Sequence, residues 1–188
     1  MDVSAVVLSA RPVTAEVPGV VVLPYVSIFH DAAGLLEARM AAIRKVRTPY
    51  FFFLDDDDAL PDDFDRVLAL CLGAGAAVAY TNELVRFPDG REVVRRSAPY
   101  DRKNWQRSIT VIHRLAVCRT DAALRAMEKV PRGCYGFEPL MYPEIAREGA
   151  AWIDEVGYIW QQRQDGMSRN PDLMRGMARA VTWANRRT

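Results

Sequence analysis

The sequence has few of the residues on which several classes of protein depend. Its 188 residues include only three cysteines, Cys71, Cys118 and Cys134, which are odd in number and widely spaced. This pattern argues against a disulfide framework and against a zinc site, and it predicts buried free thiols. Apolar runs are too short to span a bilayer, and no basic start with an apolar signal core opens the chain. We therefore expect a cytoplasmic protein.

Net charge is also small, because 25 basic and 24 acidic residues leave a balance of +1. The length and the ordinary apolar content predict one globular domain with a full core. The charge is unevenly spread, since residues 86–119 hold nine Lys or Arg and only three acids. Such a basic flank indicates an anionic ligand or partner. Arginines that pair locally on a solvated surface are an equally valid interpretation.

The stretch at residues 50–64, YFFFLDDDDALPDDF, is the most informative part of the sequence. The apolar run Phe51–Leu54 predicts a central strand buried on both faces. Four carboxylates, Asp55–Asp58, follow it directly, and their mutual repulsion favours a bound divalent cation such as Mg or Mn. In open α/β sheets, ligands bind beyond the carboxyl ends of the strands. The alternative is a solvated acidic turn before a helix.

Apolar periodicity predicts an α/β fold with a mostly parallel central sheet, flanked by helices. We expect strands at 3–8, 19–23, 51–54, 76–80 and 151–158, a strand or strand and turn at 108–119, and helices at 32–46, 62–72, 121–129, 140–148 and 171–187. Pro88-Asp89-Gly90 predicts a hairpin, and therefore a small antiparallel insert. No glycine-rich phosphate fingerprint follows the first strand, which argues against a Rossmann dinucleotide site.

Three segments, taken in order, resemble the inverting glycosyltransferases with the GT-A fold, in particular the family 2 type. LLEARMAAIRKVRTPYFFFLDDDDALPDDF is similar to the family's helix with an arginine, its apolar strand, its DxD motif and the following proline. GFEPLMYPEIAREGAAWIDE is similar to the segment with the catalytic acid residue, and YIWQQRQDGMS to the closing segment. The resemblance covers most of Leu35 to Ser168. It implies a GT-A-like fold, a nucleotide-sugar donor and a divalent cation, Mn or Mg.

The resemblance also assigns roles around the acidic run. Asp55 and Asp57 stand for the first and third positions of DxD and would hold the metal, with Asp57 the better ligand. Asp55 or Asp56 would lie near the ribose and diphosphate. Arg39 matches the helix arginine and would face the donor. A metal that bridges carboxylate and diphosphate neutralises the leaving group, which supports this assignment independently.

Glu138 is the predicted general base, because inverting transfer needs a carboxylate to take the proton of the attacking hydroxyl. Many relatives have an Asp directly after this Glu, where this chain has Pro139. The base is therefore Glu138 or lies elsewhere, and Glu138 could instead be a helix N-terminal charge. Many relatives also complete the metal site with a His where Arg163 stands, and an arginine binds diphosphate rather than metal.

Two residues after the first strand, Ser9 and Arg11, lie where a nucleotide would bind, although a loop serine is weak support. The two histidines, His30 and His113, are expected to be hydrogen-bonded structural residues. We divide the single domain into a donor nucleotide half at 1–85, an acceptor and catalytic half at 86–170, and a basic C-terminal helix at 171–188.

Together these features predict a metal-dependent inverting glycosyltransferase that moves a sugar from a nucleotide sugar to a hydroxyl acceptor. A haloacid-dehalogenase-type phosphohydrolase fits less well, because Ala59 stands where it needs Thr or Ser. A nucleotidyltransferase would need a glycine- and lysine-rich loop after the first strand. A nucleotide-sugar-binding module without transferase activity stays open, as does a polyanionic acceptor such as a modified nucleic acid.

Overall fold

A computed structural model describes residues 3–9, 17–26, 32–107, 111–113, 115–130, 137–163 and 182. Its elements, in chain order, are β1 (Val3–Ser9), β2 (Val21–Val26), α1 (Ala32–Lys45), β3 (Tyr50–Asp55), α2 (Phe64–Gly73), β4 (Val78–Arg86), β5 (Glu92–Arg95), α3 (Arg102–Arg107), β6 (Ala116–Arg119), α4 (Thr120–Met127), α5 (Phe137–Ala146) and β7 (Ala150–Gln161). The predicted C-terminal helix lies outside the described residues, apart from Thr182. No helix in the described ranges has the length and hydropathy needed to cross a membrane.

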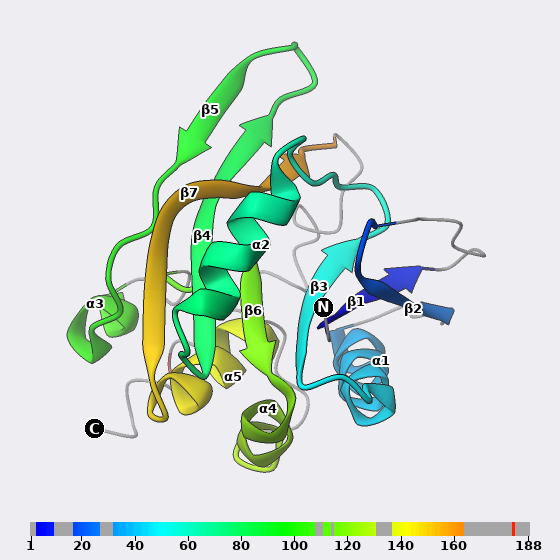
Figure 1. Ribbon diagram of the computed structural model, residues 1–188, viewed down its shortest axis with the longest axis vertical. Coiled ribbons are helices and arrows are strands. Elements are labelled where there is room, and N and C mark those ends of the chain that lie inside the picture. The colour runs from blue at the N-terminus through cyan, green and yellow to red at the C-terminus, as the bar shows by residue number, and fades with distance from the viewer. Residues whose placement is uncertain are drawn as a thin grey trace.

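The strands form one sheet in the order β2-β1-β3-β6-β4-β5, and β7 pairs with β4 (Figure 1). β1 is parallel to both β2 and β3, and β4 is parallel to β7. β6 runs antiparallel between β3 and β4, and β5 is the predicted hairpin partner of β4. The predicted α/β class is confirmed, and the antiparallel part is larger than the single hairpin expected.

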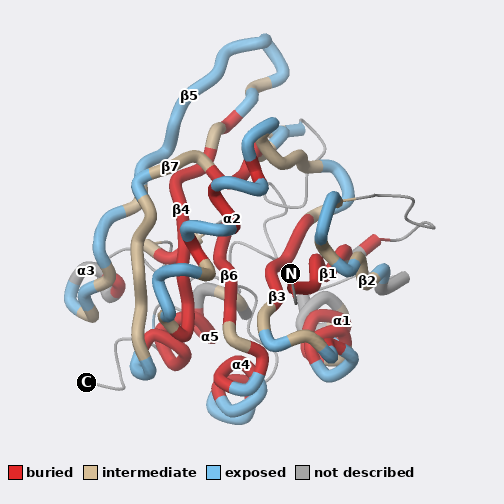
Figure 2. Tube along the Cα trace, in the orientation of Figure 1, coloured by how far each residue is buried: buried red, intermediate tan, exposed pale blue. Residues whose placement is uncertain are grey.

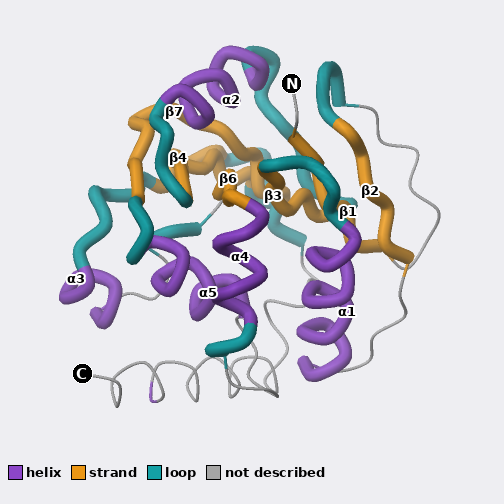
Figure 3. Tube along the Cα trace, turned by 60° about the horizontal axis from the view of Figure 1, so that its bottom comes forward, coloured by secondary structure: helices purple, strands orange, loops and turns teal. Residues whose placement is uncertain are grey.

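Helices cover both faces of this sheet, with α1, α4 and α5 on one side and α2 on the other (Figure 3). The apolar run of β3 is unbroken because both faces of this strand are covered. Phe51 and Phe53 pack in the core that includes α1, α4 and α5, whereas Phe52 and Leu54 pack in the core that includes α2. All four are buried, as Figure 2 shows for this strand. Each such side chain contributes about 1.5–3 kcal/mol, which makes β3 a rigid base for the acids after it.

Element boundaries differ from the expected ones mainly where distant segments pair. β4 and β7 are longer than predicted because they pair with each other over nine positions. α5 begins at Phe137, so Glu138 lies inside its first turn and not just before it. Pro139 is tolerated there because backbone N–H groups in a first turn have no intrahelical partner. The sequence did not predict α3, whose Trp105 is buried against the core.

Gly157 lies where β7 bulges against β4, and its Cα approaches the side chain of Thr81 closely. Replacing Gly157 tests how tightly the two strands pack there. A Cβ at this position would lie 2.6 Å from Thr81 Oγ1 and 2.9 Å from Thr81 Cγ2. Thr81 is held in place, since its hydroxyl accepts from the Leu115 N–H and donates to the Asn82 carbonyl. We expect Gly157→Ala to lower the free energy of unfolding, measured in urea, by about 1–3 kcal/mol. If the clash is the cause, the same change should cost clearly less in a Thr81→Ala background.

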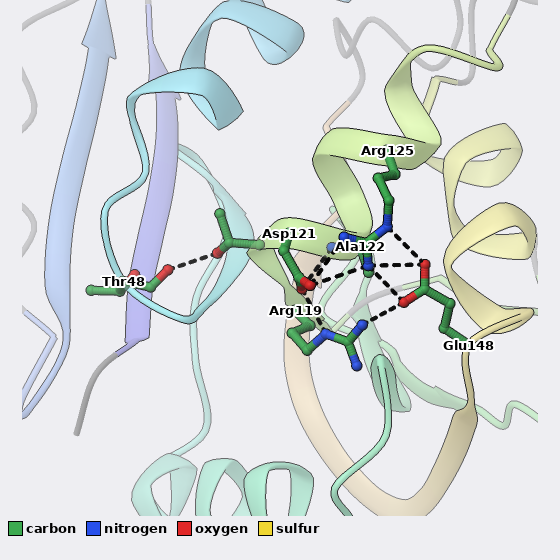
Figure 4. Close-up of polar contacts among 7 residues, drawn as sticks. Thr48, Arg119, Asp121, Ala122, Arg125 and Glu148 are labelled. Atoms are coloured by element: carbon green, nitrogen blue, oxygen red, sulfur yellow. Dashed lines mark hydrogen bonds and ion pairs between the residues drawn. The ribbon is translucent and has the colours of Figure 1, made fainter.

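An ion-pair network ties the end of β6 and helix α4 to the turn before β7 (Figure 4). Its four charged side chains are Arg119, Asp121, Arg125 and Glu148. Hydrogen bonds from Arg119 hold the pKa of Asp121 below its usual value, and bonds from Arg125 do the same for the pKa of Glu148. Beside them, the Thr120 hydroxyl donates to the Thr48 carbonyl. This network lies at the opposite end of β3 from the acidic run, so it anchors α4 and does not build the site.

Candidate active site

The acidic run forms a tight turn at the carboxyl end of β3. The Asp58 N–H donates to the Asp55 carbonyl at 3.2 Å, so the four acids are held in one short loop. Because β1 and β3 are parallel neighbours, the end of β1 lies beside this turn. There the buried Ser9 donates a hydrogen bond of 2.6 Å from Oγ to Asp56 Oδ2. Two residues predicted to contact the nucleotide are thus brought together, whereas Arg11 lies outside the described residues.

A buried arginine joins the acidic turn to the predicted base. Arg39 on α1 is 7% exposed, and its Nη2 lies 3.4 Å from Asp55 Oδ1. Its Nη1 forms an ion pair with Glu138 in the first turn of α5. The guanidinium also lies over the Phe53 ring, 5.3 Å from the centroid. Burial of these charges is tolerated because they alternate in sign, so a predicted metal ligand and the predicted base share one cation.

The surroundings of Asp57 disfavour its charged form. Burial raises its pKa first, and the neighbouring charges of Asp55 and Asp56 raise it further. The nearest described cation is Arg163, whose Nη1 is 3.8 Å from Asp57 Oδ2, and both side chains are about half exposed. Arg163 therefore lies beside the acidic turn. A carboxylate in this environment gains most from an added cation.

Asp58, in contrast, is held by two hydrogen bonds from β7, a contact that was not predicted from the sequence. Its Oδ2 accepts from the Tyr158 hydroxyl at 2.8 Å, and its Oδ1 accepts from the Gln161 N–H at 2.9 Å. The same Tyr158 oxygen accepts from the Asp55 N–H at 3.1 Å. Two features could have drawn attention to the contact: a fourth acid beyond those of a DxD motif, and a tyrosine within an apolar strand.

The residues at the turn fit a cation that a phosphate ligand helps to hold. Among the described residues, no group of three or more His, Cys, Asp or Glu could hold a metal alone. Asp57, with Asp55 beside it, offers hard carboxylate oxygens, which suit Mg or Mn. Magnesium in proteins is commonly held by one or two carboxylates together with substrate phosphates. One or two aspartates are therefore enough for a site that forms with its nucleotide.

Most arginines of the basic stretch have local acidic partners in the structure. The pairs are Arg86 with Glu92, Arg91 with Asp89, Arg95 with Glu83, Arg96 with Asp154, and Arg119 with Asp121. This arrangement favours the interpretation of a locally neutralised surface. His113 also pairs with the buried Glu83, through Nδ1 at 3.0 Å, as expected of a hydrogen-bonded structural histidine.

Comparison with known proteins identifies the family and the fold of this chain. Residues 25–128, more than half of the chain, match the family model described as Glycosyl transferase family 2. No curated protein matches the sequence. The fold is similar to residues 1–349 of S. aureus TarS, with a TM-score of 0.60 and 13% identity, and to the same fragment in complex with UDP-GlcNAc, with 0.64 and 14%.

Those two matches cover 98% of this chain, which spans only 65% and 66% of the TarS fragment. A mycobacterial protein is similar at a TM-score of 0.54 and 14% identity, over 97% of this chain and 74% of its own. At such identities the likeness is one of fold. It confirms that the sheet and its flanking helices are arranged as in these structures.

Proposed function

Because this chain belongs to glycosyl transferase family 2, we propose that it transfers a sugar from a nucleotide-sugar donor to an acceptor hydroxyl. We propose further that a divalent cation binds at the acidic turn and that the transfer inverts the anomeric carbon. The complex of S. aureus TarS with UDP-GlcNAc, on a similar fold, supports a nucleotide sugar as the donor.

The observation that carries this proposal is the chain of charges from Asp55 through the buried Arg39 to Glu138. It brings the end of β3 and the start of α5 together, although 83 residues separate the two carboxylates in the sequence (138 − 55). A reaction with a leaving phosphate and an attacking hydroxyl needs one cation-binding carboxylate and one proton-accepting carboxylate. We propose that Asp55 and Glu138 supply these two carboxylates, one from each of the predicted donor and acceptor halves of the domain.

On the donor side, Ser9 and Asp56 would bind the nucleoside, where a carboxylate can accept hydrogen bonds from ribose hydroxyls. Asp57 and Asp55 would hold the cation, which when bound supplies positive charge against the diphosphate. Arg163 would leave Asp57 for the diphosphate oxygens, because a guanidinium binds phosphate with two parallel N–H bonds.

On the acceptor side, Glu138 would accept the proton of the incoming hydroxyl. The hydroxyl oxygen forms a bond to the anomeric carbon, and the bond from that carbon to the diphosphate oxygen breaks on the opposite face. One displacement of this kind inverts the configuration. Arg39 contacts both Asp55 and Glu138, so it would hold the base at a set place relative to the donor.

A donor screen by thermal unfolding tests the proposal. With Mn²⁺ present, a nucleotide sugar at 100 times its Kd should add about 2.7 kcal/mol, because it binds only the folded protein. For a chain of this length we expect Tm to rise by about 5–10 °C. The rise should disappear when EDTA replaces Mn²⁺.

The screen also separates the two functions that the sequence left open. A Tm rise together with release of the nucleoside diphosphate supports a transferase. A Tm rise without turnover in the presence of any saccharide or nucleic-acid acceptor would favour a binding module. No Tm rise with any nucleotide sugar, with either Mn²⁺ or Mg²⁺, would contradict the donor assignment.

A further inference from the structure

We propose that Tyr158 is a positioning residue, which clamps the acidic turn in the conformation that binds the cation, and that Asp58 is its partner and not a cation ligand. The inference rests on the proposed function and deepens it. It divides the four acids into Asp55–Asp57, which would face the ligand, and Asp58, which holds the turn to β7.

The first step concerns Asp58. Each of its two carboxylate oxygens accepts a hydrogen bond from β7, one from the Tyr158 hydroxyl and one from the Gln161 N–H. A cation at Asp58 would compete with both bonds and would leave a buried tyrosine hydroxyl without its acceptor. A buried hydroxyl without an acceptor lowers the stability of the folded protein. We therefore infer that Asp58 accepts hydrogen bonds from β7 and does not bind the cation.

The second step concerns Tyr158, which is 0% exposed. Its oxygen accepts from the Asp55 N–H and its proton goes to Asp58, so one hydroxyl spans the acidic turn from its first residue to its last. The turn is also closed by the bond from the Asp58 N–H to the Asp55 carbonyl. Asp56 and Asp57, between these two points, are thereby held in a fixed loop.

The third step is why such a clamp is needed. Asp55, Asp56 and Asp57 are consecutive in a turn closed by the Asp58 N–H to Asp55 carbonyl bond, so three like charges are held close together and repel one another. A free turn would relax by spreading these side chains apart, and a cation would have to gather them again. Holding the ligands together before binding lowers that cost, and it is the usual contribution of groups around a metal site.

The fourth step places the clamp on a rigid support. Ala59 and Ile159 exchange two backbone hydrogen bonds of 3.0 and 2.9 Å, which fasten the turn to β7. Next to them, Tyr158 pairs in register with Glu83 on the central strand β4. The segment that ends β7 and carries Arg163 therefore also sets the geometry of the acids that Arg163 faces.

The test compares Tyr158→Phe with Tyr80→Phe. Tyr80 is a matched control, because it is also 0% exposed and its hydroxyl also donates a hydrogen bond, to the Ala98 carbonyl at 2.7 Å. Both variants should lower Tm to a similar extent. Only Tyr158→Phe should weaken Mn²⁺-dependent binding of UDP, measured by calorimetry, by about 10–100-fold, as loss of an outer-shell partner does.

Kinetics with a nucleotide sugar give a second reading. In Tyr158→Phe the Mn²⁺ concentration for half-maximal rate should rise by a similar factor, whereas kcat at saturating Mn²⁺ should recover to within a few-fold of wild type. A purely structural role would not separate the two quantities in this way. Should Tyr158→Phe fail to fold, Asp58→Asn gives the same comparison, because it weakens the clamp from the other side.

The outcomes are distinguishable. Absence of Mn²⁺-dependent binding by the wild-type protein, of UDP and of the nucleoside diphosphates of every other donor in the screen, would overturn the proposed function and this inference together. Wild-type binding with an unchanged Kd in Tyr158→Phe would overturn the inference alone. A much larger loss in Asp58→Asn than in Tyr158→Phe would make Asp58 a ligand. Equal losses that do not add in the double variant support the clamp.

Discussion

Replacing Glu138 by glutamine is expected to reduce kcat by about 10²–10⁴-fold and to leave the Kd of the nucleotide sugar almost unchanged. Glutamine keeps the size of the side chain and can still accept a hydrogen bond from Arg39, but it cannot take a proton from the acceptor. The effect therefore falls on the chemical step and not on donor binding. Release of nucleoside diphosphate gives the rate, and calorimetry gives the Kd.

Glu144→Gln is the matched control, since it makes the same change on the same helix. Glu144 is buried and pairs with Lys129 and Arg147, at 3.8 and 3.4 Å. We expect this variant to lose stability and to keep kcat. Wild-type turnover in Glu138→Gln would show that the base lies elsewhere. A common loss of activity and stability in both variants would point to helix α5 as a structural element only.

Asp57→Asn is expected to remove the Mn²⁺-dependent rise in Tm with a nucleotide sugar. Its loss in cation affinity should exceed the about 10–100-fold that outer-shell partners contribute, because Asp57 would touch the cation directly. Asp62→Asn is the control, as an exposed acid in the loop after the turn. An equal loss of cation affinity in the two variants would show that Asp57 contributes only negative charge and does not bind the cation directly.

The same variant has an opposite effect when no cation is present. The pKa of Asp57 is raised in the folded protein, so its contribution to stability is present below the unfolded value of 3.8 and is lost as pH rises through the folded value. At pH 7 its charge therefore destabilises the cation-free fold. We expect Asp57→Asn to have a higher Tm than wild type at pH 7 in EDTA, and this difference to disappear in acid. A lower Tm at pH 7 would contradict the repulsion.

This reversal is what a binding site for a cation should produce. Mutually repelling carboxylates held close together lower the stability of the cation-free protein, and the proposed cation would offset that loss. The pH dependence of binding follows from the same pKa. Protons compete with the cation for Asp57, so Mn²⁺-dependent binding should weaken on acidification at a higher pH than for an ordinary aspartate.

Much of the fold could be predicted because the patterns behind it are local. The unbroken apolar run of β3 and the helical periodicity of α1 and α2 each depend on residues within one element, and the structure confirms them. The direction of β6 and the length of β7 could not be read in this way. Both depend on pairing with β4, and a strand's own residues do not identify its partner.

The site divides along the same line. Carboxylates that follow a buried strand lie at the carboxyl edge of the sheet. The sequence therefore predicts both the position of Asp55–Asp58 and the excess negative charge at that edge. The family, too, follows from the amino-acid sequence of residues 25–128 without the structure. The partners of each acid were not contained there: Ser9 for Asp56, Arg163 for Asp57, and Tyr158 for Asp58. These contacts join residues 47 to 106 positions apart (56 − 9 and 163 − 57). They exist because the sheet sets β1 beside β3, and because the Ala59–Ile159 bridge fastens the acidic turn to the end of β7.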